Sequence, residues 1–295
     1  MITALVTLYY PNEANIENII GISKQVDRLI VCDNTPNKMS LERFEGYNEI
    51  RYYSNGKNNG LSAAFNEVLK DTSNSWHDDD FIIFFDQDSK IPDGYIESLV
   101  REFQIIENAG HKIGCLGPVY FNNSNQNIEI PRQKKRINDH DFIVNSVITS
   151  SMLCKYSILS SVGFWNEDVF LDLADWDLCW RMRERGYYSF KTDAVLLNHT
   201  LGTGEYRKGR MRIRYGAAIR EYYQVRDGLY LMCKGYTPFK NRIRFLCGFL
   251  FRLTIHTRVL EEKDKRKKYI IRGWEDYKKH ITGEYKEVAD SAWQK

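Results

Sequence analysis

The chain has 295 residues, 43% hydrophobic and 27% charged, which suits a large globular domain and excludes a disordered or collagen-like protein. Its six cysteines form no CxxC pair, which argues against zinc-knuckle and redox sites and favours reduced thiols in a cytoplasmic protein. The net charge of +3 hides an asymmetry, because residues 205–295 carry 23 Lys and Arg against 11 Asp and Glu, whereas residues 1–204 carry 19 against 28.

Strand and helix patterns alternate over the first 120 residues. The start, MITALVTLYYPNE, has no basic n-region, so a secretory signal peptide is not expected. Strands are predicted within residues 2–10, 27–35, 49–60, 78–89 and 112–121, and helices at 14–25, 61–71 and 95–110. Because the connections are short and polar, we expect an α/β fold with a Rossmann-like mixed, mostly parallel sheet and helices on both faces.

The sequence after residue 120 is less regular. Residues 121–141, FNNSNQNIEIPRQKKRINDHD, are polar and predict a flexible loop with a basic segment at 132–136. A closing strand is expected at 194–200, AVLLNHT, and the chain is expected to be largely helical from about Tyr215 onward.

Polar clusters stand where the predicted strands end. Asp33 and Asn34 follow the second strand, the turn at Gly60 follows the third, and Asp86 and Asp88 close the fourth. In parallel sheets of this kind, ligands bind beyond the carboxyl ends of the strands. We therefore expect these clusters to meet at one rim.

The pair Asp86 and Asp88, in FFDQDS, is a candidate metal site. Mg²⁺ and Mn²⁺ take one or two carboxylates and complete their coordination with water and substrate phosphates, which would suit a diphosphate ligand. The spacing alone is equally compatible with a cap of the next helix. Likewise, the segment Asn58 to Gly60 could bind an anion at a helix start or form a plain turn, and Asp33 could accept a ligand hydrogen bond or cap a turn.

These motifs, in this order, resemble the family 2 glycosyltransferases with the GT-A fold. The matching segments are the first strand with Thr7, Tyr9 and Pro11, then CDN, NNGLSAAFN, FDQDS, the segment 150–187 and NHTLG. FDQDS in particular resembles the bacterial rhamnosyltransferase branch. The likeness spans residues 2–203, and it implies a catalytic domain at 1–204, with a nucleotide-sugar half at 1–120 and an acceptor half at 121–204, followed by a basic helical region at 205–295.

The resemblance also implies roles for individual residues. A UDP- or dTDP-sugar donor would be bound by Thr7, Tyr9, Asp33, Asn59, Gly60 and Asp86. The Mg²⁺ or Mn²⁺ ion would be held by Asp88 and Asp86, with His199 approaching from the other side. Without the resemblance, the sequence around His199 indicates a histidine at the end of a strand that forms only local hydrogen bonds.

A second acidic cluster, FLDLADWDLCWRM, falls in the predicted acceptor half. The resemblance implies that Asp175 is the general base, although Ala174 stands where the family usually has Glu, so Asp172 and Asp177 remain alternatives. At the first turn of a helix, the positive helix end should lower the pKa of Asp175. Trp165, Trp176 and Asp172 are expected to contact an acceptor sugar, although tryptophans near a core are more often packing residues.

The basic C-terminal region contains an apolar segment at 243–260, IRFLCGFLFRLTIHTRVL. Arg244, Arg252 and Arg258 interrupt it, so a membrane-spanning helix is not expected. Two readings remain open: a helix lying on an anionic membrane surface, and a helix packed on the catalytic domain or a partner subunit. The run EEKDKRKK, residues 261–268, should be solvated, and nucleic acid is not expected because no recognition motif is present.

Together these features predict a metal-dependent, inverting glycosyltransferase. It would move L-rhamnose from dTDP-rhamnose to a growing, lipid-linked cell-surface glycan, at the cytoplasmic face of the membrane. Alternatives are transfer of another UDP- or dTDP-sugar and a non-catalytic glycan-binding subunit. A sugar nucleotidyltransferase is disfavoured, because the loop after the first strand reads YYPNEAN rather than a glycine-rich loop with Arg and Lys. Homo-oligomerisation is left open.

Overall fold

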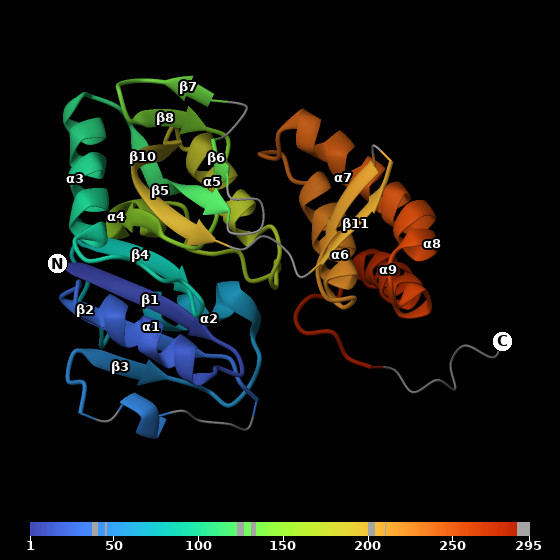
Figure 1. The fold of residues 1–295 in the computed structure, drawn as a ribbon, viewed down its shortest axis with the longest axis horizontal. Coiled ribbons are helices and arrows are strands. Elements are labelled where there is room, and N and C mark those ends of the chain that lie inside the picture. Colours follow the sequence, from blue (N-terminus) through green and yellow to red (C-terminus); the bar gives the residue numbers. More distant parts are fainter. Residues whose placement is uncertain are drawn as a thin grey trace.

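The computed structural model describes residues 1–36, 41–44, 46–122, 127–130, 134–199, 204–209 and 211–287. In this part of the chain, ten strands form one sheet in the order β3-β2-β1-β4-β9-β5-β10-β8-β7, with β6 paired to β5 (Figure 1). The strands are β1 Ile2–Leu8, β2 Arg28–Asp33, β3 Ile50–Tyr53, β4 Phe81–Asp86, β5 Ile113–Asn122, β6 Asn127–Glu129, β7 Lys134–Arg136, β8 Asp141–Val144, β9 Met152–Lys155 and β10 Tyr188–His199.

Helices connect and cover these strands. They are α1 Glu13–Ser23, the 3₁₀ turn η1 Leu41–Phe44, α2 Gly60–Leu69, α3 Tyr95–Asn108, α4 Tyr156–Ser161 and α5 Ala174–Glu184. Asn12 starts α1 with a capping box, because its side chain accepts from the Asn15 N–H while the Asn15 side chain accepts from the Asn12 N–H. The alternation of strands and helices predicted from the sequence is confirmed.

The four strands β3, β2, β1 and β4 are all parallel. Ala4, Leu5 and Val6 are successive residues of β1 and all are fully buried, so both faces of the sheet are covered at this point. The other half is mixed: β9 runs antiparallel to β4 and β5, and β10 is parallel to β5 but antiparallel to β8. The predicted α/β architecture is therefore correct, with antiparallel pairs added beyond β4.

Two local predictions in this half were wrong. The segment expected to be a flexible loop, 121–141, contains β6 and β7 in its described parts. The closing strand begins at Tyr188 rather than at residue 194, because Ser189 to Thr192 pair with both β5 and β8 before a register shift between Thr192 and Leu196. Irregular strands of this kind lack the regular alternation that makes a strand recognisable.

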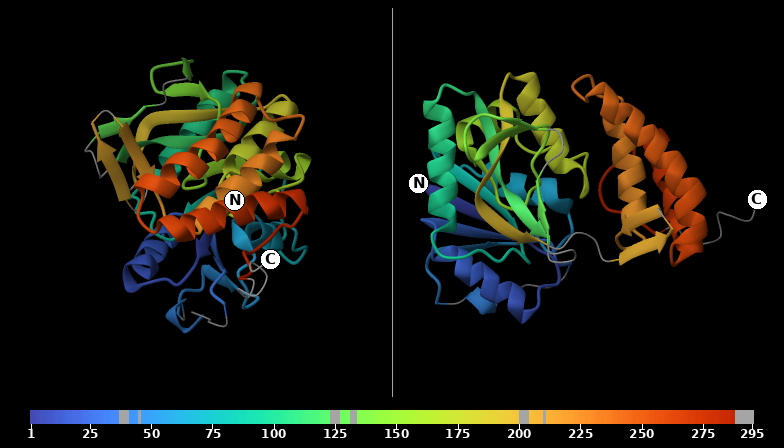
Figure 2. Two further views of the ribbon diagram at one scale, coloured as in Figure 1. Left: turned by 90° about the vertical axis from the view of Figure 1, so that its right-hand side faces the viewer. Right: turned by 45° about the horizontal axis from the view of Figure 1, so that its top comes forward.

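The C-terminal region lies beside the edge toward which the arrowheads of β1 and β4 point (Figures 1 and 2). It consists of the hairpin β11 Gly204–Lys208 and β12 Met211–Tyr215, then α6 Arg220–Met232, α7 Phe239–Phe251, the π-helical turn η2 Arg252–His256, α8 Thr257–Val259 and α9 Lys263–Lys278. The predicted helical extension is confirmed. Of the helices in the described residues, none is long and apolar enough to cross a membrane.

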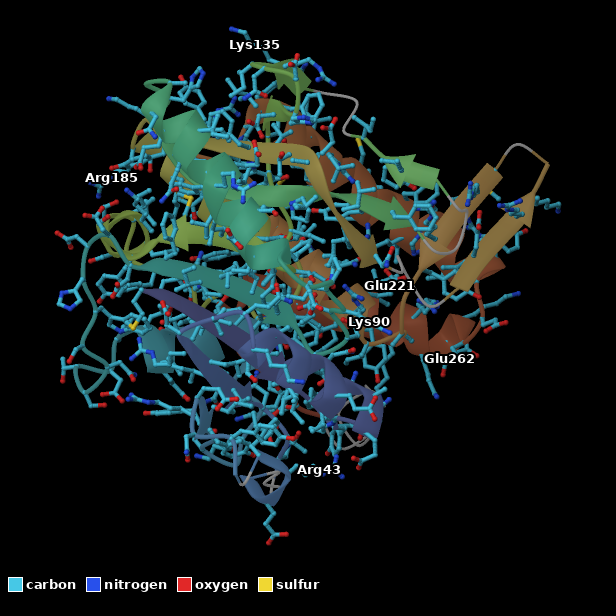
Figure 3. All side chains as sticks on the ribbon, turned by 60° about the vertical axis from the view of Figure 1, so that its left-hand side comes forward. Arg43, Lys90, Lys135, Arg185, Glu221 and Glu262 are labelled. Carbon is cyan, nitrogen blue, oxygen red and sulfur yellow. The ribbon has the colours of Figure 1, made fainter. Side chains whose placement is uncertain are left out.

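A buried ion cluster around Glu221 of α6 ties these helices together (Glu221 is labelled in Figure 3). Its carboxylate contacts His256 Nδ1 at 2.7 Å, Arg252 Nε at 3.0 Å and Arg266 Nη1 at 3.1 Å. Although burial opposes ionisation, His256 and the two arginines hold the pKa of Glu221 below its ordinary value. Because Arg266 is only 2% exposed, the run 261–268 is not fully solvated as expected.

The turn before α2 joins the two halves of the sheet domain. Gly60 has φ +82°, and the Leu61 N–H donates to the Phe170 carbonyl at 2.9 Å. A Cβ on Gly60 would lie 2.5 Å from the Phe170 carbonyl oxygen and 2.6 Å from its ring. Only glycine fits at this position, because both the backbone angle and the close approach exclude a side chain.

We therefore expect Gly60→Ala to destabilise the protein by more than about 2 kcal/mol, since it adds a clash to the cost of the left-handed backbone. Gly56→Ala is the matched control: Gly56 also has positive φ, +69°, but nothing lies within 4 Å of an added Cβ. Urea unfolding of both variants measures the difference. Equal losses of stability would show that the contact with Phe170 is unimportant.

Candidate functional site

The carboxyl ends of β1, β2 and β4 meet at one rim, as the sequence predicted. Thr7 lies opposite Asp86, and Leu8 lies opposite Asp33. Beside them is a cavity of about 360 Å³, here called the rim cavity. The sheet domain and the C-terminal region both line it, with Thr7, Leu8, Tyr9, Asn34, Asn58, Gly60, Leu61, Asp86, Gln87, Phe170, Leu171, Ile219, Tyr223, Glu284 and Tyr285.

The aspartate pair sits on a tight turn after β4. The Ser89 N–H donates to the Asp86 carbonyl at 3.0 Å, Asp86 is half-buried and Asp88 is exposed. The intervening Gln87, which the sequence analysis did not single out, accepts from the Tyr9 N–H at 2.7 Å and donates to the Tyr9 carbonyl at 3.2 Å. Gln87 thereby fixes Tyr9, a predicted donor-binding residue, next to the aspartates.

The charge of this turn is only partly compensated. Burial and the neighbouring Asp88 raise the pKa of Asp86 to about 6, while the charge of Arg220 opposes the rise. Arg220 belongs to α6 and forms a bidentate ion pair with Asp172. Nothing in the sequence around Arg220 marked it as a site residue, because only the fold brings α6 to the rim.

The end of β10 reaches the same turn. Lys90, labelled in Figure 3, forms an isolated antiparallel bridge with Asn198, the residue before His199. The backbone of His199 is therefore close to the aspartate turn. Its side chain, and Thr200 to Gly202 of the predicted histidine motif, lie outside the described residues.

Asp33 and Asn34 organise the far side of the rim. Asp33 is 4% exposed, and its carboxylate accepts from the Thr35 N–H at 2.8 Å and from the Tyr52 hydroxyl. Asn34 donates to the Gly60 carbonyl at 3.1 Å. The turn-capping role that the sequence left open for Asp33 is thus present, and both of its oxygen atoms already have a partner.

Asn59 faces away from the rim cavity. Its side chain donates to Glu67 at 2.8 Å, and it lines a second cavity of about 880 Å³ with Asn66, Glu67 and Glu167. This cavity is larger, but of Asp86, Asp88 and Asp175 only Asp86 lines either cavity, and it lines the rim cavity. The rim cavity is therefore the better candidate for chemistry.

The three aspartates at and just before the start of α5 lie in three different environments. Asp172 is paired with Arg220. Asp177 is fully buried and binds Arg181 at 2.7 Å, Asn166 at 3.1 Å and the Tyr236 hydroxyl at 2.6 Å. These bonds give Asp177 a structural role. Since Asp172 and Asp177 each have an arginine partner, Asp175 is the one of the three aspartates without an ion-pair partner in the described part of the chain.

The electrostatics of Asp175 differ from the prediction. Burial raises its pKa to about 7, and the charges of Asp172 and Asp86 add to the rise, against the hydrogen bond from the Trp176 N–H at 2.8 Å. We expected the helix start to lower this pKa, but loss of hydration outweighs the helix dipole. A carboxyl group that titrates near neutral pH is suited to act as a general base.

The two tryptophans do not offer open ring faces. Trp165 is 2% exposed and packs against Phe65 and Phe84, with centroid distances of 5.4 and 5.0 Å, which corrects its predicted role in stacking on a sugar. Trp176 is half-buried and packs against α7, with the Arg244 guanidinium 4.8 Å from its ring centroid. The contact with a sugar was predicted for both rings from the residue type alone. The side chains that cover the rings come from distant elements, which the local sequence does not reveal.

Two further basic residues complete the surroundings. Arg226 is 2% exposed and binds Asp227 at 2.7 Å and the Gly283 carbonyl at 2.6 Å, so it holds the C-terminal segment in place. Lys191 is 6% exposed, lies 3.6 Å from the Tyr120 ring centroid, and burial lowers its pKa to about 7. The sequence analysis did not identify Lys191.

Asp86 and Asp88 fit a divalent cation better than any other pair in the site. Two carboxylates on one turn, one with a raised pKa, form an anionic spot whose charge is only partly compensated. Mg²⁺ needs only one or two protein carboxylates when a phosphate supplies further oxygens. Within the described residues, no group of three or more His, Cys, Asp or Glu side chains could hold a metal alone. A cation here would thus depend on its substrate for ligands.

Comparison with known proteins agrees with this geometry. A family model described as "Glycosyl transferase family 2" matches residues 9–162. The dTDP-rhamnosyl transferase RfbF of Shigella flexneri is 25% identical over 291 residues, which cover 95% of this chain and 93% of that protein.

Solved structures show the same fold. GalNAc-T7, crystallised with UDP, GalNAc and Mn²⁺, matches with a TM-score of 0.57 and 10% identity over 95% of this chain and 56% of its own. S. aureus TarS matches with a TM-score of 0.52 and 13% identity over 95% and 49%. This chain therefore spans about half the length of these two proteins, and it has the GT-A fold.

The buried ion pair of Asp177 should contribute more to stability than an exposed ion pair does. Asp177→Asn should lower the free energy of unfolding by about 3 kcal/mol or more, because it leaves Arg181 without its buried counter-charge. Glu97→Gln, which removes an exposed partner of Arg101 on α3, should cost less than about 0.5 kcal/mol. Urea unfolding checks both, and an Asp177→Asn variant as stable as Glu97→Gln would contradict the structural role.

Proposed function

This chain belongs to glycosyl transferase family 2, and we propose that it transfers L-rhamnose from dTDP-rhamnose to a hydroxyl of a growing, lipid-linked cell-surface glycan. The observation that carries the proposal is that Thr7, Tyr9 and Asp86 meet at the rim cavity, near enough to Asp175 for the charge of Asp86 to contribute to its raised pKa of about 7. The proposed base Asp175 thus lies near Asp86, the carboxylate that is proposed to stand beside the donor diphosphate. The named activity of the Shigella flexneri relative supports the choice of donor.

In this proposal Asp175 takes the proton of the acceptor hydroxyl as its oxygen attacks the anomeric carbon. The bond from that carbon to the diphosphate breaks on the opposite face, so the configuration inverts. Thr7 and Tyr9, at the end of β1, bind the nucleoside together with Asp33, while Asn59 and Gly60 form the turn beside it. Residues 1–204 act as the catalytic domain.

Asp86 and Asp88 would hold the divalent cation, and His199 stays a predicted third ligand. When bound, Mg²⁺ or Mn²⁺ offsets the charge that develops on the departing diphosphate. Arg220 remains paired with Asp172, which keeps a positive charge close to Asp86. Tyr223, Glu284 and Tyr285 bring the C-terminal region to the wall of the rim cavity.

The donor is tested by incubating the purified protein with dTDP-rhamnose, dTDP-glucose, UDP-glucose and UDP-GalNAc, each with Mg²⁺ or with EDTA. We expect nucleoside diphosphate release from dTDP-rhamnose alone, and at least a hundredfold loss of rate with EDTA that added Mg²⁺ restores. Turnover of a UDP-sugar instead would favour the alternative donor. No turnover of any sugar nucleotide would favour a glycan-binding protein without catalytic activity.

Asp175→Asn should lower kcat by about a thousandfold and leave dTDP binding within about twofold, because the base acts in the chemical step. In the unmodified protein, Asp175 is protonated below its pKa of about 7, so kcat/KM should rise about tenfold per pH unit up to that point and then level off. Asp93→Asn, at an exposed carboxylate, is the control. Normal activity in Asp175→Asn would place the base elsewhere.

A further inference from the structure

Helix α7 has two apolar stripes, and only one is packed. Phe245 and Phe249 of α7 and Leu253 of η2 repeat every four residues and face the protein. Phe245 lies 6.4 Å from Trp176 and 6.1 Å from Trp180, measured between ring centroids, and Phe249 and Leu253 pack against the apolar cluster of α6 and α9. This stripe confirms that the segment packs on the catalytic domain, one of the two readings left open.

The second stripe is exposed. Phe239, Ile243, Leu246 and Leu250 recur at spacings of four, three and four residues, so they share one face of the helix. Their exposed fractions are 73%, 49%, 48% and 51%, and no residue of α7 is fully buried. We call these four residues the outer stripe. Contiguous exposed apolar side chains of this kind usually mark an interaction surface.

The charges beside the outer stripe are all of one sign. Lys240 and Arg244 are exposed on α7, and Arg258 is exposed on α8, which follows it along the chain. Residues 228–260 contain neither Asp nor Glu. Self-association through this face would bring like charges together without a carboxylate from the same segment. Anionic lipid headgroups would instead complement the basic residues while the apolar side chains enter the interface.

We propose that the outer stripe of α7 docks the protein on an anionic membrane surface, where a lipid-linked acceptor is presented to the site. The inference rests on the proposed function for its acceptor, but the docking itself does not require catalysis. Apolar side chains would enter the boundary of headgroups and acyl chains, while Lys240 and Arg258 contact lipid phosphates. The face is thus a lipid-binding site in the part of the chain that carries its basic charge.

The packed stripe places this surface close to the chemistry. Trp176 follows the proposed base Asp175 and donates its N–H to that carboxylate at 2.8 Å. The ring of Trp176 then contacts Phe245 and lies under Arg244 of α7. One helix layer, about 10 Å thick, therefore separates the docked face from the acceptor side. A glycan anchored in the membrane would need to extend only a short distance to reach Asp175.

Flotation with vesicles tests the docking. The full chain is mixed with vesicles of phosphatidylcholine alone or of equal parts phosphatidylcholine and phosphatidylglycerol. We expect flotation only with the anionic vesicles, and at least about a tenfold weaker partition for Leu246→Asp and for Leu250→Asp. Lys240→Gln with Arg258→Gln should weaken partition about twentyfold at low salt. Ile105→Asp, an exposed apolar residue of α3 with 43% exposure, should float like the unmodified protein.

Release of dTDP from dTDP-rhamnose in vesicle-free solution separates the two proposals. If the outer-stripe variants keep that rate but no longer float, docking is supported independently of the donor. If the protein floats but turns over no sugar nucleotide, only the proposed function fails. Docking is overturned if the intact protein does not float, or if Leu246→Asp and Leu250→Asp float normally. Light scattering that shows these variants converting a dimer to a monomer would instead identify a second copy of the chain as the occupant.

Discussion

Burial of like-charged carboxylates beside the end of β4 is the constraint on which this site depends. Asp86 and Asp88 stand on one turn, and the charges of Asp86 and Asp172 act on Asp175. Arg220 offsets part of this charge through its pair with Asp172. Burial raises the pKa of Asp86 and of Asp175 toward neutrality, and the residual repulsion adds to the rise. One group thereby gains the basicity for proton transfer, and the other is an attractive ligand for a cation.

The structure brings these groups together by joining segments that are far apart in the chain. Gly60 docks on the Phe170 carbonyl, which fixes the turn after β3 against the segment that precedes α5. Arg220 of α6 reaches back to Asp172, and Gln87 holds the backbone of Tyr9. The C-terminal region is therefore part of the site rather than an appendage, and Tyr223 and Tyr285 line the cavity.

The sequence was sufficient for the architecture and for the position of the rim, because buried parallel strands are continuous apolar runs that end at polar residues. It also placed Asp86 and Asp88 at this rim, where the structure has their turn, while their role as metal ligands stays a prediction. It could not give the direction of the pKa shift of Asp175, which is set by burial under other elements.

Two other predictions were wrong for the same reason, because contacts with distant elements set the burial of the residue. The core position of Trp165 depends on Phe65 and Phe84, and the burial of Arg266 depends on Glu221, which lies 45 residues away. Arg220 and Lys191 carry no local signal, since only tertiary packing brings them near the aspartates. Gln87 was the exception: its position between two candidate ligands could have identified it.

We propose that Asp86 and Asp88 bind a divalent cation together with the diphosphate of the donor. A crystal structure with Mn²⁺ and dTDP tests it most directly, because manganese is located independently by its anomalous scattering. We expect one manganese peak in contact with both a carboxylate of this pair and the diphosphate. A nucleotide bound in the rim cavity with no manganese beside Asp86 and Asp88 would contradict it.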